Sequence, residues 1–389
     1  MKDMAITKNT RRELNALTSL RFFAAAMIVF FHCRGLFGIS EQLVDSVPRA
    51  QAMSFFFVLS GFILVYVYPS FDRVSDIRRF WVARFARLWP VHFAAFLLLV
   101  VLLHKGLSWR ALLNLAMINS WIPFTRCYMS YNWVSWAIAT EFAFYLLFPF
   151  LLYKWERTWF IKLLATGFLL IGLIAFCNHL QIPYSSKEDW GLSLHALIGV
   201  HPLGRLFEFV LGMVFALWWQ KKLSRNHIGR SLGTILELLI FTLVIVVIYF
   251  RTDLVYIVKK HYSWVGPAGI VWLSRSGIVC LFYGFLVAVM ALEKGVISWL
   301  LASRLLVWLG QLSFSIYMVH QVLIRYYIKK ADFFSFVPDP VALVGFCCTL
   351  LLVAFLMRTL IENPCRRTLI KMWDQRSGVK GEKSGKKYV

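Results

Sequence analysis

Ten apolar segments, each close to twenty residues long, recur along the chain and limit the folds that it can adopt. A helix needs about 20 apolar residues to cross the ~30 Å hydrocarbon core of a membrane. The pattern predicts an all-α polytopic membrane protein with about ten transmembrane helices. The segments are residues 17–33, 52–69, 86–104, 134–153, 159–178, 203–219, 232–250, 274–292, 308–327 and 340–361.

Lysine and arginine are distributed unevenly between the connections of these segments. If the N-terminus is cytoplasmic, the connections richest in basic residues also lie in the cytoplasm, as the positive-inside rule requires. We therefore expect a cytoplasmic N-terminal segment (1–16), a ten-helix transmembrane domain (17–365) and a basic, disordered cytoplasmic tail (366–389). Both termini are then predicted to be cytoplasmic.

The formal net charge of +23 has to be explained by this arrangement. The bases lie in short connections and in the tail, with no soluble module to present them to nucleic acid. We expect them to orient the chain and to attract anionic membrane lipids, and we expect no nucleic-acid partner. One connection departs from the rule, because residues 251–273 carry Arg251, Lys259 and Lys260 on the predicted outer side.

Two ionisable residues interrupt the first apolar segment, Arg21 near its start and His32 near its end. Eleven helical steps of about 100° return to nearly the same face, and they span about 16 Å. Arg21 and His32 are therefore predicted to share one face of one helix. Ionisable groups at this depth usually face a bundle interior or a water-filled cavity.

Further polar residues are predicted to lie at a similar depth in other helices. Counting from the helix ends places Glu141 and Ser60 near the middle of the membrane and His320 in its outer half. Ser313, Tyr317 and His320 are spaced i, i+4 and i+7, so they form one polar stripe. These residues are expected to meet the face that carries Arg21 and His32.

Two arginine-containing pairs allow both a functional and a structural interpretation. Arg84 and Arg87 lie at the predicted cytoplasmic end of the third segment, where guanidinium groups could bind phosphates or simply anchor the helix. Arg205 and Glu208 are spaced i, i+3 and could form a structural ion pair. Arg205 also stays a candidate for substrate contact, with Ser60, Ser313 and Tyr317.

A buried histidine beside a carboxylate is typical of general-base catalysis, in which the carboxylate orients the imidazole. We therefore expect His32, Glu141 and His320 to be catalytic. The same cluster could instead relay protons in a membrane transporter, which is the alternative from another functional class. No histidine spacing supports a metal site, so we expect none.

The residues taken together resemble the acyltransferase family 3 membrane proteins, which O-acylate glycans and other acceptors. The resemblance extends from about residue 15 to residue 368, with the motifs in the family's order. The matching pieces are Leu20-Arg21 to Phe31-His32, Phe55 to Phe62, Phe80 to Pro90, Trp136 to Pro149, Arg205 to Gly212, Gly310 to His320 and Ile361 to Pro364.

The resemblance implies transfer of an acyl group, most often acetyl, from cytoplasmic acyl-CoA to a hydroxyl of an envelope or exported glycan or a lipid-linked sugar. It implies a multi-pass protein of the bacterial inner membrane with no tightly bound cofactor. Arg84 and Arg87 would hold CoA phosphates, Arg21 would line the donor path, and His32 would be the central catalytic residue. The segment Trp136-Ala-Ile-Ala-Thr-Glu141 lacks serines that relatives often carry there, which leaves a role for those hydroxyls in doubt.

Overall fold

The computed structural model describes residues 12–45, 49–186, 188, 190–334 and 336–376. Within these ranges the chain forms helices and no strands, which confirms the predicted all-α fold. Nine helical stretches there are long and apolar enough to cross a membrane, and the apolar part of a tenth helix, Gln51–Val67, is slightly shorter. The predicted N-terminal segment lies largely outside the described residues, as does the end of the tail from residue 377.

Each predicted apolar segment corresponds to one helix, except for the eighth, which is divided between two. These helices are α1 (Asn15–His32), α3 (Arg49–Val67), α4 (Val74–Leu103), α7 (Ser135–Leu152), α8 (Trp155–His179), α9 (Pro202–Lys221), α10 (Arg230–Tyr249), α12 (Gly266–Arg275) with α13 (Val279–Met290), α15 (Arg304–Lys329) and α17 (Asp339–Leu356). The chain then continues through a π-helical turn, Met357–Glu362, into α18 (Asn363–Arg376).

Two predicted boundaries were wrong for physical reasons. Helix α4 begins at Val74, twelve residues before the predicted start, because its arginines are satisfied within the fold; Arg79, for example, forms two hydrogen bonds with Asp374 of α18. The predicted helix 274–292 is broken after Arg275, where Gly277 adopts a positive φ of 40°. A conformation of this kind suits glycine because it has no side chain.

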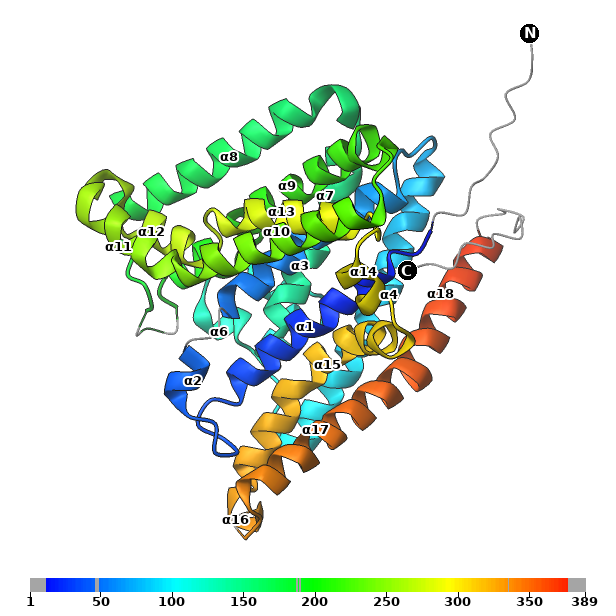
Figure 1. Cartoon of the computed structure of the whole chain (residues 1–389). Coiled ribbons are helices and arrows are strands. Elements are labelled where there is room, and N and C mark those ends of the chain that lie inside the picture. Colours follow the sequence, from blue (N-terminus) through cyan, green and yellow to red (C-terminus); the bar gives the residue numbers. More distant parts are fainter. Residues whose placement is uncertain (1–11, 46–48, 187, 189, 335, 377–389) are drawn as a thin grey trace.

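The centre of the bundle is built on two close helix crossings (Figure 1). Helix α3 packs along α9, and α1 packs along α15. A Cβ atom added at Gly61 would overlap the carbonyl group of Phe209, and one added at Gly310 would overlap that of Thr18. Small residues that let two backbones approach are a common means of packing membrane helices. These two crossings bring the polar faces of α1, α3 and α15 into the interior.

The start of α1 and helix α18 lie at the same end of the bundle, on the right of Figure 1. The other end of the bundle holds α2 (Glu41–Asp45), α6 (Thr125–Tyr128), α11 (Arg251–His261) and α16 (Ala331–Phe334). The shared end fits the prediction that the two termini lie on one side of the membrane. Which side that is stays a prediction from the distribution of basic residues.

The crossing of α3 and α9 should not tolerate a side chain at Gly61. We expect Gly61→Val to cost about 1–3 kcal/mol, because the added atoms overlap the backbone of α9. Thermal unfolding of the purified protein in detergent would measure the change. Gly172→Val is the matched control, since Gly172 lies in α8 with no atom near the position of its Cβ. Equal stabilities of the two variants would contradict this account of the crossing.

Candidate active site

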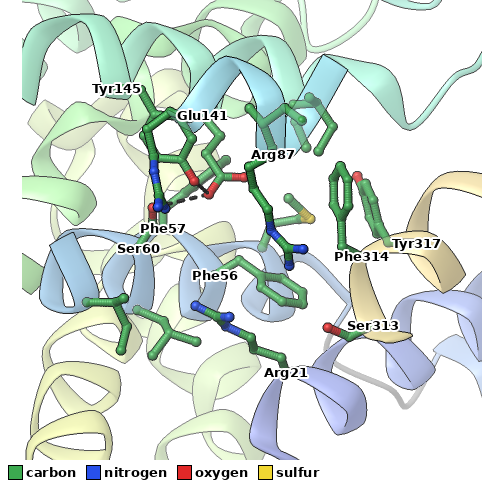
Figure 2. Close-up of a pocket in the computed structure, with 17 residues that line it drawn as sticks. Arg21, Phe56, Phe57, Ser60, Arg87, Glu141, Tyr145, Ser313, Phe314 and Tyr317 are labelled. Atoms are coloured by element: carbon green, nitrogen blue, oxygen red, sulfur yellow. Dashed lines mark hydrogen bonds between the residues drawn. The ribbon is translucent and has the colours of Figure 1, made fainter. Parts of the chain in front are cut away.

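A small cavity of about 110 Å³ lies between α1, α3, α4, α7 and α15. We call it the arginine–glutamate pocket, because Arg21, Arg84, Arg87 and Glu141 line it. Figure 2 shows Arg21 and Arg87 extending toward its centre from opposite sides, with Phe56 between them. The three arginines come from α1 and α4, so two helices distant from Glu141 in sequence supply the positive charge.

The carboxylate of Glu141 is held by two hydroxyl groups. Tyr145, one turn later on α7, donates a hydrogen bond of 2.5 Å to Oε1 of Glu141. Ser60 of α3 donates to the same oxygen at 3.2 Å. The structure therefore brings together Ser60 and Glu141, which counting along the helices placed at similar depth. Sequence reasoning did not assign a role to Tyr145, although it lies within the motif that contains Glu141.

Arg84 and Arg87 of α4 line this pocket inside the bundle, and their place at the cytoplasmic end of the membrane span stays a prediction. Arg84 and Arg87 follow the start of α4 by ten and thirteen residues. The guanidinium of Arg84 lies 5.8 Å from the ring centres of both Tyr68 and Tyr145, close enough for cation–π attraction. Arg87 forms an ion pair with Glu362, whose carboxylate is buried.

More positive than negative charge gathers around Arg87. Besides Arg21 of the pocket, Arg358 and Arg366 lie near enough to repel it. Arg358 is tied to the backbone and side chain of Gln311. Since three arginines and, among the described residues, one glutamate line the arginine–glutamate pocket, it favours an anionic ligand.

A second and larger cavity, of about 640 Å³, contains His32. We call it the histidine chamber; it is lined by His32, Trp133, Trp136, His195, Arg251 and Arg275, among other residues. Arg21 and His32 therefore lie on one helix but line different cavities. Helix α1 connects the two, as its spacing of polar residues predicted.

The hydrogen bonds of His320 fix the protonation of both imidazoles. Nδ1 of His320 lies 2.6 Å from the carbonyl oxygen of Tyr317 and 3.3 Å from that of Ile316. A carbonyl oxygen only accepts, so Nδ1 carries the proton and Nε2 of the neutral ring is an acceptor. Nε2 lies 3.1 Å from Nδ1 of His32, which therefore donates. In the neutral pair, Nε2 of His32 is the basic nitrogen.

This geometry corrects the expected role of Glu141. The hydrogen bond to His320 orients His32, whereas Glu141 lines the other cavity and is bonded to Ser60 and Tyr145. Sequence spacing placed these groups at similar depth but could not show which of them face one another.

Tyr317 and Met53 line both cavities and so form the wall between them. The hydroxyl of Tyr317 donates to the carbonyl oxygen of Val134 at 3.0 Å, which fixes the ring. Ser313, one turn earlier on α15, lines only the arginine–glutamate pocket and donates to the carbonyl oxygen of Gly310 at 2.7 Å. Of the predicted stripe of α15, Ser313 and Tyr317 therefore line the arginine–glutamate pocket and Tyr317 also lines the histidine chamber, while His320 is buried and contacts His32.

Arg205 is held by a buried network at the edge of the histidine chamber. Its Nη1 lies 3.1 Å from Oε1 of Glu208 and donates to Oγ of Ser276 at 2.6 Å, while Nη2 donates to Ser54. Ser276 in turn donates to Glu208 at 2.5 Å. These contacts compensate the charge of Arg205 within the fold. They favour the interpretation of Arg205 and Glu208 as a structural ion pair.

Comparisons with known proteins identify the family of the chain. The sequence profile of acyltransferase family 3, described as an acyltransferase domain, matches residues 14–359. The chain is 27% identical to the acyltransferase MdmB of Streptomyces mycarofaciens over 92% of both chains. It is 26% identical to the putative peptidoglycan O-acetyltransferase YrhL of Bacillus subtilis over 79% of this chain and 48% of that protein.

The O-acetyltransferase OatA of Staphylococcus aureus is 23% identical over 92% of this chain and 58% of its own length. The chain therefore spans about half the length of YrhL and OatA. No solved structure matches the chain significantly. On the extent of the profile match, the chain belongs to acyltransferase family 3. It is a multi-pass membrane acyltransferase, which displaces the transporter alternative.

Substitutions in the buried pair of Arg205 and Glu208 should change the stability of the protein rather than its catalytic activity. We expect Glu208→Gln to cost about 3–5 kcal/mol, because it leaves the guanidinium buried without its counter-charge. The double variant Arg205→Met/Glu208→Leu should recover most of this loss, since apolar residues can replace a buried ion pair. Thermal unfolding in detergent measures both, and a double variant that is less stable than Glu208→Gln would contradict the structural role.

Proposed function

We propose that this protein is an O-acyltransferase of the bacterial inner membrane that moves an acyl group, most often acetyl, from cytoplasmic acyl-CoA to a hydroxyl of a glycan or lipid-linked sugar. The observation that carries the proposal is the adjacency of two cavities with complementary chemistry. One is rich in arginine and suits a phosphate-bearing donor, and the other contains an oriented imidazole. The glycan acceptor is supported by the relatives named as O-acetyltransferases, one of them for peptidoglycan.

In this proposal His32 is the general base. Its Nε2 takes the proton of the acceptor hydroxyl while the oxygen attacks the thioester carbonyl. The carbon–sulfur bond then breaks, an ester bond forms, and the thiolate of CoA takes up the proton to leave as the free thiol. His320 is a positioning residue, because its Nε2 fixes the ring of His32 through Nδ1. In a variant of this mechanism, His32 attacks the thioester directly and forms a transient acyl-histidine. Labelling of the protein by labelled acetyl-CoA would detect this intermediate.

The arginine–glutamate pocket is assigned to the donor. Arg21, Arg84 and Arg87 supply charge-assisted hydrogen bonds of the kind that phosphates favour. Tyr317 and Met53 stand where the thioester would have to pass to reach His32. Ser60 keeps Glu141 in place beside the arginines, and Ser313 lines the same path.

The role of the two histidines can be separated by substitution. We expect His32→Ala to lower acyl transfer by about 10²–10⁴-fold, the usual contribution of a general base. His320→Gln should keep more of kcat than His320→Leu, because an amide oxygen can still accept from Nδ1 of His32. The assay is release of CoA from labelled acetyl-CoA by protein in nanodiscs, with soluble peptidoglycan fragments as acceptor.

His227→Ala is the control for this assay, since His227 is exposed in the connection before α10. If His320→Gln and His320→Leu lost the same activity, the positioning role would be wrong. A fully active His32→Ala would remove His32 from the mechanism.

The donor site can be tested by comparing acetyl-CoA with acetylpantetheine, which lacks the phosphates of CoA. We expect Arg87→Gln/Glu362→Gln, which removes the ion pair as a unit, to raise KM for acetyl-CoA about tenfold or more. The KM for acetylpantetheine should stay close to that of the wild type. A similar rise of KM for both donors would show that Arg87 stabilises the fold and does not bind the phosphates.

A further inference from the structure

The histidine chamber carries positive charge that its described lining residues do not balance. Arg205, Arg251 and Arg275 line it, and no described lining residue is acidic. Glu208 neutralises Arg205 from behind the wall, which leaves the charges of Arg251 and Arg275. A cavity inside a membrane protein that keeps two unbalanced guanidinium groups favours the entry of an anion.

The guanidinium of Arg275 is held in place by neutral groups. Its Nη2 donates to Nδ1 of His195 at 2.6 Å and to the hydroxyl of Tyr184 at 3.2 Å. His195 accepts this bond and is therefore neutral, since arginine has no acceptor. Gly199 leaves room for the same side chain, because a Cβ at this position would lie 2.7 Å from Nη1 of Arg275.

These contacts orient Arg275 without cancelling its charge. Nη2 already donates to His195 and Tyr184, and among the described residues no hydrogen bond occupies Nη1. The N–H groups of Nη1 can donate charge-assisted hydrogen bonds to an oxygen of a carboxylate or a phosphate.

Arg251 begins α11 and reaches the chamber from a segment that breaks the positive-inside rule. The other cations of this segment, Lys259 and Lys260, are exposed and do not line the chamber. Within the described chain Arg251 has no carboxylate partner, and Asp253 lies two residues away on another side of the helix. Arg251 is therefore a second cation of the chamber that can bind an anion.

Aromatic side chains complete the chamber. Trp133, Trp136 and Tyr184 line it together with His32. Flat aromatic faces with a few placed polar groups are typical of pockets that bind small, partly apolar molecules. One face of Trp133 is covered by the guanidinium of Arg325, whose carbon lies 4.8 Å from the ring centre. The chamber therefore combines surfaces for a sugar ring, a base for its hydroxyl and two cations.

We propose that the acceptor carries a carboxylate or phosphate group, which Arg251 and Arg275 bind while a hydroxyl of the same molecule reaches His32. This inference rests on the proposed function and narrows its acceptor to anionic sugars. The charge of the acceptor then determines its orientation, because the anion is held on the side of α11 and α12 while the reacting hydroxyl lies near α1 and α15.

The test uses three matched sugars with the full-length protein in nanodiscs. Methyl glucoside is neutral, methyl glucuronide carries a carboxylate, and glucose 1-phosphate carries a phosphate. Binding is measured as a rise of the thermal transition at constant ionic strength. We expect at least one of the anionic sugars to half-saturate at a concentration about tenfold or more below that of methyl glucoside. The better of the two identifies carboxylate or phosphate as the group that is recognised.

Arg251→Gln and Arg275→Gln should each weaken binding of the preferred anion about tenfold and leave methyl glucoside unchanged. Lys259→Gln/Lys260→Gln removes two charges from the same helix outside the chamber and should change nothing. Arg251→Gln keeps the test decisive if Arg275→Gln unfolds, because no described hydrogen bond of Arg251 is lost. Equal binding of neutral and charged sugars, a preference that persists in Arg251→Gln, or no binding of either anion up to about 0.1 M would each overturn the proposal.

Release of CoA from acetyl-CoA in the same preparation separates this inference from the proposed function. If donor use depends on His32 while the sugars show no charge preference, only the anionic acceptor is wrong. If charge preference is found but acetyl-CoA is not used by the wild type, the chamber binds anions and the proposed donor is wrong.

Discussion

The cost of keeping charge and unpaired polar groups away from water shapes the whole interior of this protein. An ionised side chain in an apolar surrounding is tolerated only where partners are close. Arg205 with Glu208 and Arg87 with Glu362 meet this need as ion pairs. The pair of Arg87 and Glu362 links α4 to the π-helical turn before α18, and the pair of Arg205 and Glu208 lies within α9. The buried ion pairs therefore also determine how the bundle is assembled.

Another buried carboxylate meets the same need with backbone groups. Glu237 of α10 accepts from the backbone nitrogens of Gly295, Ile297 and Ser298, at distances of 2.9 to 3.1 Å. These nitrogens belong to the first turn of α14 (Val296–Leu301) and the residue before it, where helical N–H groups have no partner within the helix. The charge of Glu237 is thereby stabilised by a helix N-terminus and no second ionised side chain is required. By contrast, Arg251 and Arg275 of the histidine chamber have no carboxylate partner among the described residues.

Much of the fold could be predicted from the length and spacing of apolar segments, because the membrane imposes both. The similar depth of Ser60 and Glu141, and the placement of Arg21 and His32 along one helix, followed from counting residues. The partner of His32 could not be predicted in this way, since helix rotation and packing decide whether Glu141 or His320 faces it. The start of α4 could not be predicted, because arginines at this position are typical of loops. Only the structure shows that Asp374, Glu362 and aromatic rings interact with them.

The wall formed by Tyr317 and Met53 has a consequence for the energetics of the cell. A bacterial cytoplasmic membrane stores free energy as a difference in proton concentration and potential, worth about 2.3 kcal/mol per charge for each 100 mV. An enzyme with donor on one side and acceptor on the other would discharge it through a continuous water path. Here the cavities are separate and meet at a ring whose hydroxyl is committed to Val134. In the proposed function, an acyl group would therefore have to pass this ring without opening such a water path.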